Sequence, residues 1–250
     1  MAAFVVAIDA GACGSTTLKP HPDGDSENNG GTGAGGAGGG TGGSEGTDAA
    51  VDVLPTCSGT ICTVAFASDS TWITYDGDPA STPGAQAAGP AQPVCLNQSS
   101  PPNCPAGALL YGHPGGWSFS LASIPGAVWV WAPGIAATDV SDLRKIYLSR
   151  TFTVGTSPGG SIRIAADDSA RVLINGTDVG GVGSITDINL ASMSNTQLTT
   201  IDVSVALHPG SNTITVVAQN GPASYAGCNP SCTYQSNPAG VVFGGTLSYH

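Results

Sequence analysis

The sequence predicts an all-β fold, a jelly-roll β-sandwich preceded by a disordered glycine-rich N-terminal linker. Three observations lead to this prediction: apolar and polar residues alternate in many short segments, turn-forming residues separate those segments, and no segment sustains a helical period. Alternation places successive side chains on opposite faces of a strand. Eight or more such strands with regular turns are typical of a sandwich, and 250 residues are enough for one.

The composition excludes some partners and favours an extracellular location. The chain has 6 Lys and Arg against 17 Asp and Glu, a formal net charge of −11, with 37 Gly and 18 Pro. Because nucleic acids are bound through basic surfaces, no nucleic-acid partner is expected. No run of 18 apolar residues is present, so we expect membrane contact only through a lipid anchor. A polar surface of Ser, Thr, Asn and Gly is typical of secreted β proteins.

Residues 1–13, MAAFVVAIDAGAC, are interpreted as a leader. The apolar stretch Phe4–Ile8 is followed by small residues that run directly into Cys13, although no cationic residue precedes that stretch. This order resembles the lipobox of bacterial lipoproteins, in which the cysteine becomes the lipidated N-terminus. The resemblance implies a lipidated Cys13, and the alternative is a short apolar leader with an incidental cysteine.

A disordered linker is predicted at residues 14–53, ahead of a folded domain at residues 54–250. Ten of the fourteen residues from Gly30 to Gly43 are glycine, as in flexible coils. Residues 33–38 match the pattern G-x-G-x-x-G, but the strand and helix that a dinucleotide site needs do not flank them. We therefore expect the linker to hold the folded domain away from a surface.

Six of the seven cysteines stand in close sequential pairs, namely Cys57 with Cys62, Cys95 with Cys104, and Cys228 with Cys232. Pairing between neighbours has the lowest loop-closure cost, which favours three short-range disulfides and an oxidising compartment. Cys13 is then the cysteine left over for lipidation. Zinc is the rival use of Cys228 and Cys232, but no second close pair with finger spacing joins them.

Strand candidates fill the folded domain, and turn signals such as Asn175-Gly176, the strongest two-residue hairpin signal, separate them. One short helix is expected, at Leu190–Leu198. The predicted strands span residues 71–75, 117–121, 128–131, 146–154, 162–164, 172–174, 201–205, 214–218 and 241–243.

Five segments of this domain follow one another in an order that carries a family resemblance. They are Ile124–Trp131, the strand ending at Phe152, Ala165–Gly176, Leu207–Ile214 and Asn237–Phe243. In this order they resemble galactose-binding-domain-like jelly rolls of bacterial secreted and surface proteins. The resemblance covers about residues 63–250, and it implies a carbohydrate-binding or adhesive module.

The adjacent acids Asp167 and Asp168 have two interpretations. Short acidic side chains at a turn accept hydrogen bonds from the backbone N–H groups that follow and so hold the bend. They also offer the hard oxygen ligands that calcium prefers, and a similar Asp-Asp pair occurs in PA14-type sugar-binding domains, where calcium bridges protein and glycan. Turn capping is preferred, with calcium as the possible cofactor.

Two tyrosines are the preferred ligand contacts. Tyr225 and Tyr234 flank the Cys228–Cys232 loop, which we expect to be displayed at one end of the sandwich, where loops carry function. The tryptophans Trp117, Trp129 and Trp131 could stack on sugar rings, but large aromatic residues more often fill the core.

No motif indicates an enzyme. The chain lacks H-E-x-x-H, S-x-x-K and P-loop patterns, and the domain contains no glutamate for a paired-Glu glycosidase. Two hypotheses follow. The first is a non-enzymatic, lipid-anchored extracellular or outer-membrane module that binds glycans. The second is a structural or adhesive domain that binds protein or extracellular matrix without a sugar pocket.

Overall fold

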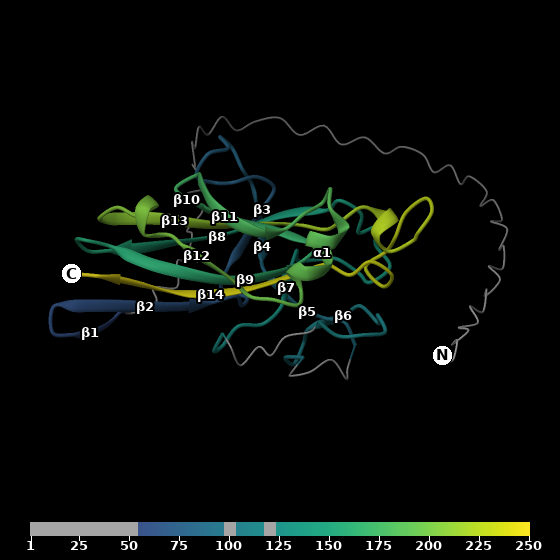
Figure 1. Ribbon diagram of the computed structural model, residues 1–250, viewed down its shortest axis with the longest axis horizontal. Coiled ribbons are helices and arrows are strands. Elements are labelled where there is room, and N and C mark those ends of the chain that lie inside the picture. The colour runs from purple at the N-terminus through teal and green to yellow at the C-terminus, as the bar shows by residue number, and fades with distance from the viewer. Residues whose placement is uncertain (1–54, 98–103, 118–123) are drawn as a thin grey trace, which may run out of the picture. The chain divides into compact units, whose positions relative to one another are not determined.

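The structure of the protein is a computed structural model that describes residues 55–97, 104–117 and 124–250. The predicted leader, the lipidation site Cys13 and the whole of the predicted linker lie outside these residues. Within them the chain forms a β-sandwich of two sheets, as predicted (Figure 1). No helix among them is long and apolar enough to span a membrane.

The first sheet is built around the long C-terminal strand β14 (Gly240–Tyr249), which pairs with β2, β7 and β9. Its pairings are antiparallel except that of β5 with β6, which is parallel. The other members are β1 (Thr56–Ser58), β2 (Ile61–Ala67), β5 (Gln92–Cys95), β6 (Leu109–Leu110), β7 (Val130–Trp131), β9 (Gly159–Asp167) and β12 (Thr199–Asp202).

The second sheet is antiparallel in the order β11-β10-β13-β8-β3-β4. Its strands are β3 (Ile73–Tyr75), β4 (Ala87–Pro90), β8 (Lys145–Val154), β10 (Ser169–Ile174), β11 (Thr177–Gly183) and β13 (Gly210–Gln219). Alternate residues of the two sheets, such as Leu148 in β8 and Ile164 in β9, are fully buried between them. This confirms the period-two pattern on which the fold prediction rests.

The β10–β11 hairpin turns at Asn175 and Gly176, as the sequence predicts. Both residues have positive φ, 52° and 79°, which the two-residue type I′ turn requires and which asparagine and glycine adopt most readily. The three predicted disulfides are also present, Cys57–Cys62 across β1 and β2, Cys95–Cys104, and Cys228–Cys232.

The predicted helix and the strand predicted at 201–205 differ from the structure in their bounds. The helix α1 spans Ile188–Ser194 rather than Leu190–Leu198, because Asp187 caps it and accepts hydrogen bonds from the N–H groups of its first turn. The strand predicted at 201–205 ends at Asp202, whose side chain accepts a bond from the Ser204 N–H where the 3-10 helix η2 (Ser204–Ala206) begins. Most of the strand predicted at 117–121 lies outside the described residues.

Candidate binding site

Asp167 and Asp168 lie where the chain crosses from one sheet to the other. Asp167 is the last residue of β9, and β10 begins in the opposite sheet at Ser169. Asp167 accepts hydrogen bonds from the Trp117 indole N–H (2.8 Å) and from the side-chain amide of Asn195 (3.3 Å). Asp168 accepts one from the backbone N–H of Gly221 (2.7 Å). Through these hydrogen bonds the two carboxyls connect the sheet crossing to three other segments of the chain.

Their environment favours a shared proton. Burial, and then the charge of Asp168, raises the pKa of Asp167 to about 7, while hydrogen bonds from Trp117 and Asn195 act in the opposite direction. Burial also raises the pKa of Asp168. The two side chains hydrogen-bond each other, and this bond raises the pKa of Asp167 and lowers that of Asp168. Burial of the two carboxyls therefore favours the protonated form of the pair.

The turn-capping interpretation is wrong about the partners of these acids. The donors belong to residues 28, 50 and 53 positions away in the chain, and not to the backbone that directly follows. The position of the pair at the sheet crossing is the physical reason, because Trp117, Asn195 and Gly221 approach it there from other segments.

A calcium ion does not fit the pair as it is arranged. Calcium takes six to eight oxygen ligands, whereas three of the four carboxylate oxygens here receive N–H donors, whose hydrogens would repel a cation. Among the described residues, no group of three or more His, Cys, Asp or Glu side chains could hold a metal ion.

Melting curves with calcium or with EDTA test this arrangement. We expect calcium to shift the unfolding midpoint of the full chain by less than about 1 °C, because a ligand stabilises only if it binds the native state. Replacing Asp168 with Ala should cost about 1–3 kcal/mol under both conditions, since it leaves the buried Gly221 N–H without an acceptor. A calcium-dependent rise that Asp168→Ala abolishes would restore the metal site.

Tyr225 lies beside the acid pair, at the end of the 3-10 helix η3 (Ala223–Tyr225). A Cβ placed on Gly221 would stand 2.6 Å from Tyr225 Cδ2 and 2.5 Å from Asp168 Oδ2, so only glycine fits between ring and carboxylate. The Tyr225 hydroxyl is buried without a hydrogen-bond partner among the described residues. Desolvation, followed by the charges of Asp168 and Asp187, raises its pKa. The hydroxyl therefore stays protonated beside the acids.

Tyr234 does not project into solvent, although residues 229–231 of the neighbouring loop are exposed. Its side chain is 2% exposed, its ring stacks on Tyr111 at 5.3 Å between centroids, and its hydroxyl accepts a bond from the Trp131 indole N–H (3.0 Å). Two aromatic neighbours therefore hold the Tyr234 side chain in the core, while the loop beside it is displayed as expected. One side of its ring nevertheless lines a cavity.

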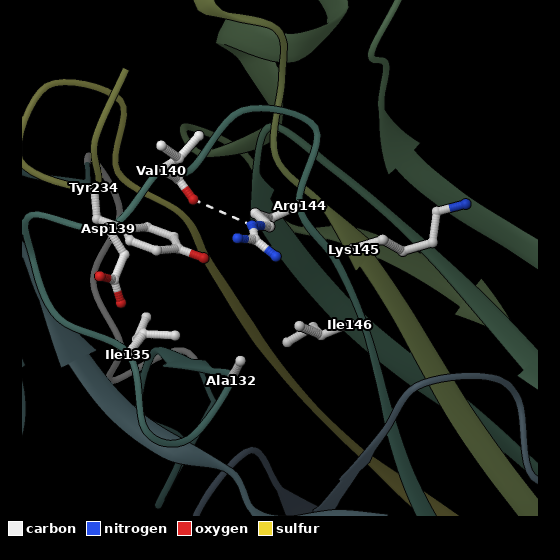
Figure 2. Close-up of a pocket in the computed structure, with 8 residues that line it drawn as sticks. All are labelled: Ala132, Ile135, Asp139, Val140, Arg144, Lys145, Ile146 and Tyr234. Atoms are coloured by element: carbon white, nitrogen blue, oxygen red, sulfur yellow. Dashed lines mark hydrogen bonds between the residues drawn. The ribbon is translucent and has the colours of Figure 1, made fainter. Parts of the chain in front are cut away.

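This cavity, the Tyr234 pocket, has a volume of about 160 Å³ and is shown in Figure 2. Hydrogen bonds of the Tyr234 and Gln235 N–H groups to the Asp139 and Ala137 carbonyls bring two distant segments together to form it. The Tyr234 hydroxyl and the Arg144 guanidinium face the cavity, and the Asp139 carboxylate lies at its edge beside Ile135. The whole lining consists of Ala132, Ile135, Asp139, Val140, Arg144, Lys145, Ile146 and Tyr234.

Sequence reasoning missed Asp139 and Arg144. Neither belongs to a motif, and both precede β8 in a stretch without periodicity. The only signal was the pair of adjacent cations, Arg144 and Lys145, in a chain with six cations in all.

The tryptophans considered as sugar platforms lie in the core. Trp131 is fully buried and Trp129 nearly so. Trp129 stacks on Trp117 with 4.1 Å between ring centroids, and Trp117 also donates to Asp167. Their faces are therefore occupied by protein, as the core interpretation predicts.

A second cavity, of about 310 Å³, lies between α1 and β11 and is lined in part by Leu190 and Met193. With Ile188, these side chains are each about half exposed. We call Leu190 and Met193, which line this cavity together, the α1 apolar surface.

Comparison with known proteins gives no family. No family model and no curated protein matches the chain. Solved structures that resemble it include a β-glucuronidase from Ruminococcus gnavus in complex with uronic isofagomine (TM-score 0.39, 8% identity, 79% of this chain and 30% of that one). Others are a putative β-galactosidase from Bacteroides fragilis (0.37, 13%, 73% and 23%) and the α-L-rhamnosidase of Streptomyces avermitilis complexed with L-rhamnose (0.34, 23%, 46% and 10%).

The chain thus spans less than a third of the length of each of these glycosidases. TM-scores below 0.4 and identities below 25% carry no inference about function. The function must therefore be sought in the site itself.

Proposed function

We propose that the protein is a non-enzymatic extracellular module that binds glycans in the Tyr234 pocket. In this proposal Cys13 carries a lipid anchor, and residues 14–53 separate the folded domain from the membrane. We treat the protein as a binding module because H-E-x-x-H, S-x-x-K and P-loop patterns are absent from its sequence and the folded domain contains no glutamate.

The chemistry of the Tyr234 pocket supports this proposal. Ala132, Ile135 and Ile146 form an apolar floor, while the Asp139 carboxylate, the Arg144 guanidinium and the Tyr234 hydroxyl surround it (Figure 2). A sugar ring has an apolar face and a rim of hydroxyl groups, and ligand sites combine apolar lining with a few placed polar groups in this way. A volume of about 160 Å³ is below the ~300–1,000 Å³ of drug-sized ligands, so the pocket would take one ring of a longer glycan.

A glycan array with the full chain is the first test, with a variant that fills the pocket. Figure 2 shows the methyl group of Ala132 at the pocket floor, so Ala132→Leu should occupy part of the cavity. We expect it to weaken binding of any glycan found by about tenfold or more. Ala87→Leu makes the same change at an exposed position of β4 and should leave binding unchanged. Equal binding by both variants would place the glycan elsewhere.

An adhesive or structural role is the second candidate, and the α1 apolar surface favours it. Exposed apolar side chains that are grouped together commonly mark contact surfaces for other proteins. An array without a glycan, together with binding to a purified extracellular matrix protein that Leu190→Asp abolishes, would favour this role over the first.

A further inference from the structure

Arg144 presents unused hydrogen-bond donors to the Tyr234 pocket. Its Nε donates to the Val140 carbonyl (3.2 Å), which fixes the base of the guanidinium. In the part of the chain that the structure describes, its two terminal nitrogens have no hydrogen-bond partner, and Figure 2 shows them facing the cavity. By contrast, Arg171 is ion-paired with Asp178, and Arg150 donates to Thr71. The two terminal nitrogens of Arg144 are therefore available to donate hydrogen bonds to a ligand.

Tyr234 adds a third donor to this wall. Because its oxygen already accepts the Trp131 N–H, its own hydrogen remains for a ligand. The oxygen points towards the same side of the cavity as the Arg144 guanidinium (Figure 2). Burial raises the pKa of Tyr234, while the Trp131 bond and the Arg144 charge act against this rise, so the phenol stays protonated as a donor near neutral pH. Donors alone converge here, which suits an acceptor-rich, anionic group.

Asp139 supplies the complementary acceptor on another side. One of its oxygens accepts the Ala136 N–H (2.8 Å), and the carboxylate lies beside Ile135, away from the guanidinium (Figure 2). It forms no ion pair with Arg144. The pocket therefore has donors on one side, an acceptor on another and the apolar floor between them.

We propose that the Tyr234 pocket binds a uronic acid residue of an acidic glycan. Arg144 and Tyr234 donate to the sugar carboxylate, Asp139 accepts from a ring hydroxyl, and the ring face packs on Ile135 and Ile146. This inference rests on the proposed function and names its ligand class. A sugar with a carboxylate and hydroxyl groups on one small ring matches all three sides, whereas an amino-acid carboxylate lacks the hydroxyl groups and the ring face.

Calorimetric titration of the full chain with trigalacturonate and with its fully methyl-esterified form tests the proposal. Esterification removes the negative charges and keeps the rings, so we expect it to weaken binding by about tenfold or more. Arg144→Gln should cause a similar loss, and Arg144→Lys an intermediate one, because lysine keeps the charge but not the planar fork. Arg171→Gln removes the same charge from an exposed ion pair and should change the affinity by less than about twofold.

The other outcomes separate this proposal from the one it rests on. If neutral glycans bind in a manner sensitive to Ala132→Leu, and esterification and Arg144→Gln have no effect, the glycan site stands and the uronate proposal is wrong. If N-acetylglycine binds as tightly as trigalacturonate, the pocket recognises carboxylates without a sugar, and the uronate proposal is again wrong. If no charged or neutral glycan binds, both proposals fail.

Discussion

Raising the pH from 5 to 8 should lower the stability of the protein by about 2–3 kcal/mol, and the unfolding midpoint by ~5–10 °C. The acid pair at the sheet crossing is the reason. Burial raises the pKa of Asp167 to about 7 from an ordinary value of 3.8. Between these two values the folded chain holds a proton that the unfolded chain has released. This contribution is complete below pH 3.8 and is lost as the pH rises through about 7.

Thermal unfolding of the full chain and of Asp167→Asn at several pH values measures this effect. Asparagine cannot titrate, and it retains one acceptor for the Trp117 and Asn195 donors, so its curve should be flatter than that of the wild type. His113 acts in the opposite direction, because burial lowers its pKa, and comparing the two proteins cancels its contribution. If the wild type and the variant lose stability in parallel, the pair does not share a proton.

The long strands were predictable because one face of each packs in the core, so that apolar residues recur at every second position. Residues 146–154 were expected and β8 spans 145–154, since alternate side chains of this strand pack in the core. The strand predicted at 201–205 was too long for a local reason that the alternation of residues does not show. The Asp202 side chain accepts a hydrogen bond from the Ser204 N–H, and this bond ends the strand. The sequence shows that Asp202 stands two residues before Ser204. Whether its carboxylate ends the strand there depends on how β12 pairs with β9, which the sequence does not show.

The candidate site was predictable only in its local parts. Short loop closure led to the correct disulfides, and adjacent acids marked the sheet crossing. The partners of those acids, Trp117, Asn195 and Gly221, come together only when the two sheets pack. The Tyr234 pocket likewise depends on the antiparallel bridge between Val140 and Thr233. Contacts across such sequence separations leave no periodic signal in a single sequence.

Truncation of Trp131 should have the largest effect on stability and should also disable the Tyr234 pocket. The indole is fully buried, and its N–H is the donor to the Tyr234 hydroxyl. Trp131→Ala removes the buried ring and leaves a cavity, at a cost of about 3–5 kcal/mol, or on the order of 10 °C in the unfolding midpoint. Trp131→Phe keeps most of the packing and loses one hydrogen bond, so it should cost about 1–2 kcal/mol.

Binding measurements on Trp131→Phe extend this prediction from stability to the site. Without the indole N–H, the Tyr234 hydroxyl is no longer oriented, so the affinity for a pocket ligand should fall although the fold persists. Val205→Ala is the control, because Val205 is 90% exposed and its truncation should change stability by less than about 0.5 kcal/mol. If Trp131→Ala and Val205→Ala have the same unfolding midpoint, then Trp131 does not pack in the core. If Trp131→Phe binds like the wild type, the hydrogen bond does not position Tyr234 for its ligand.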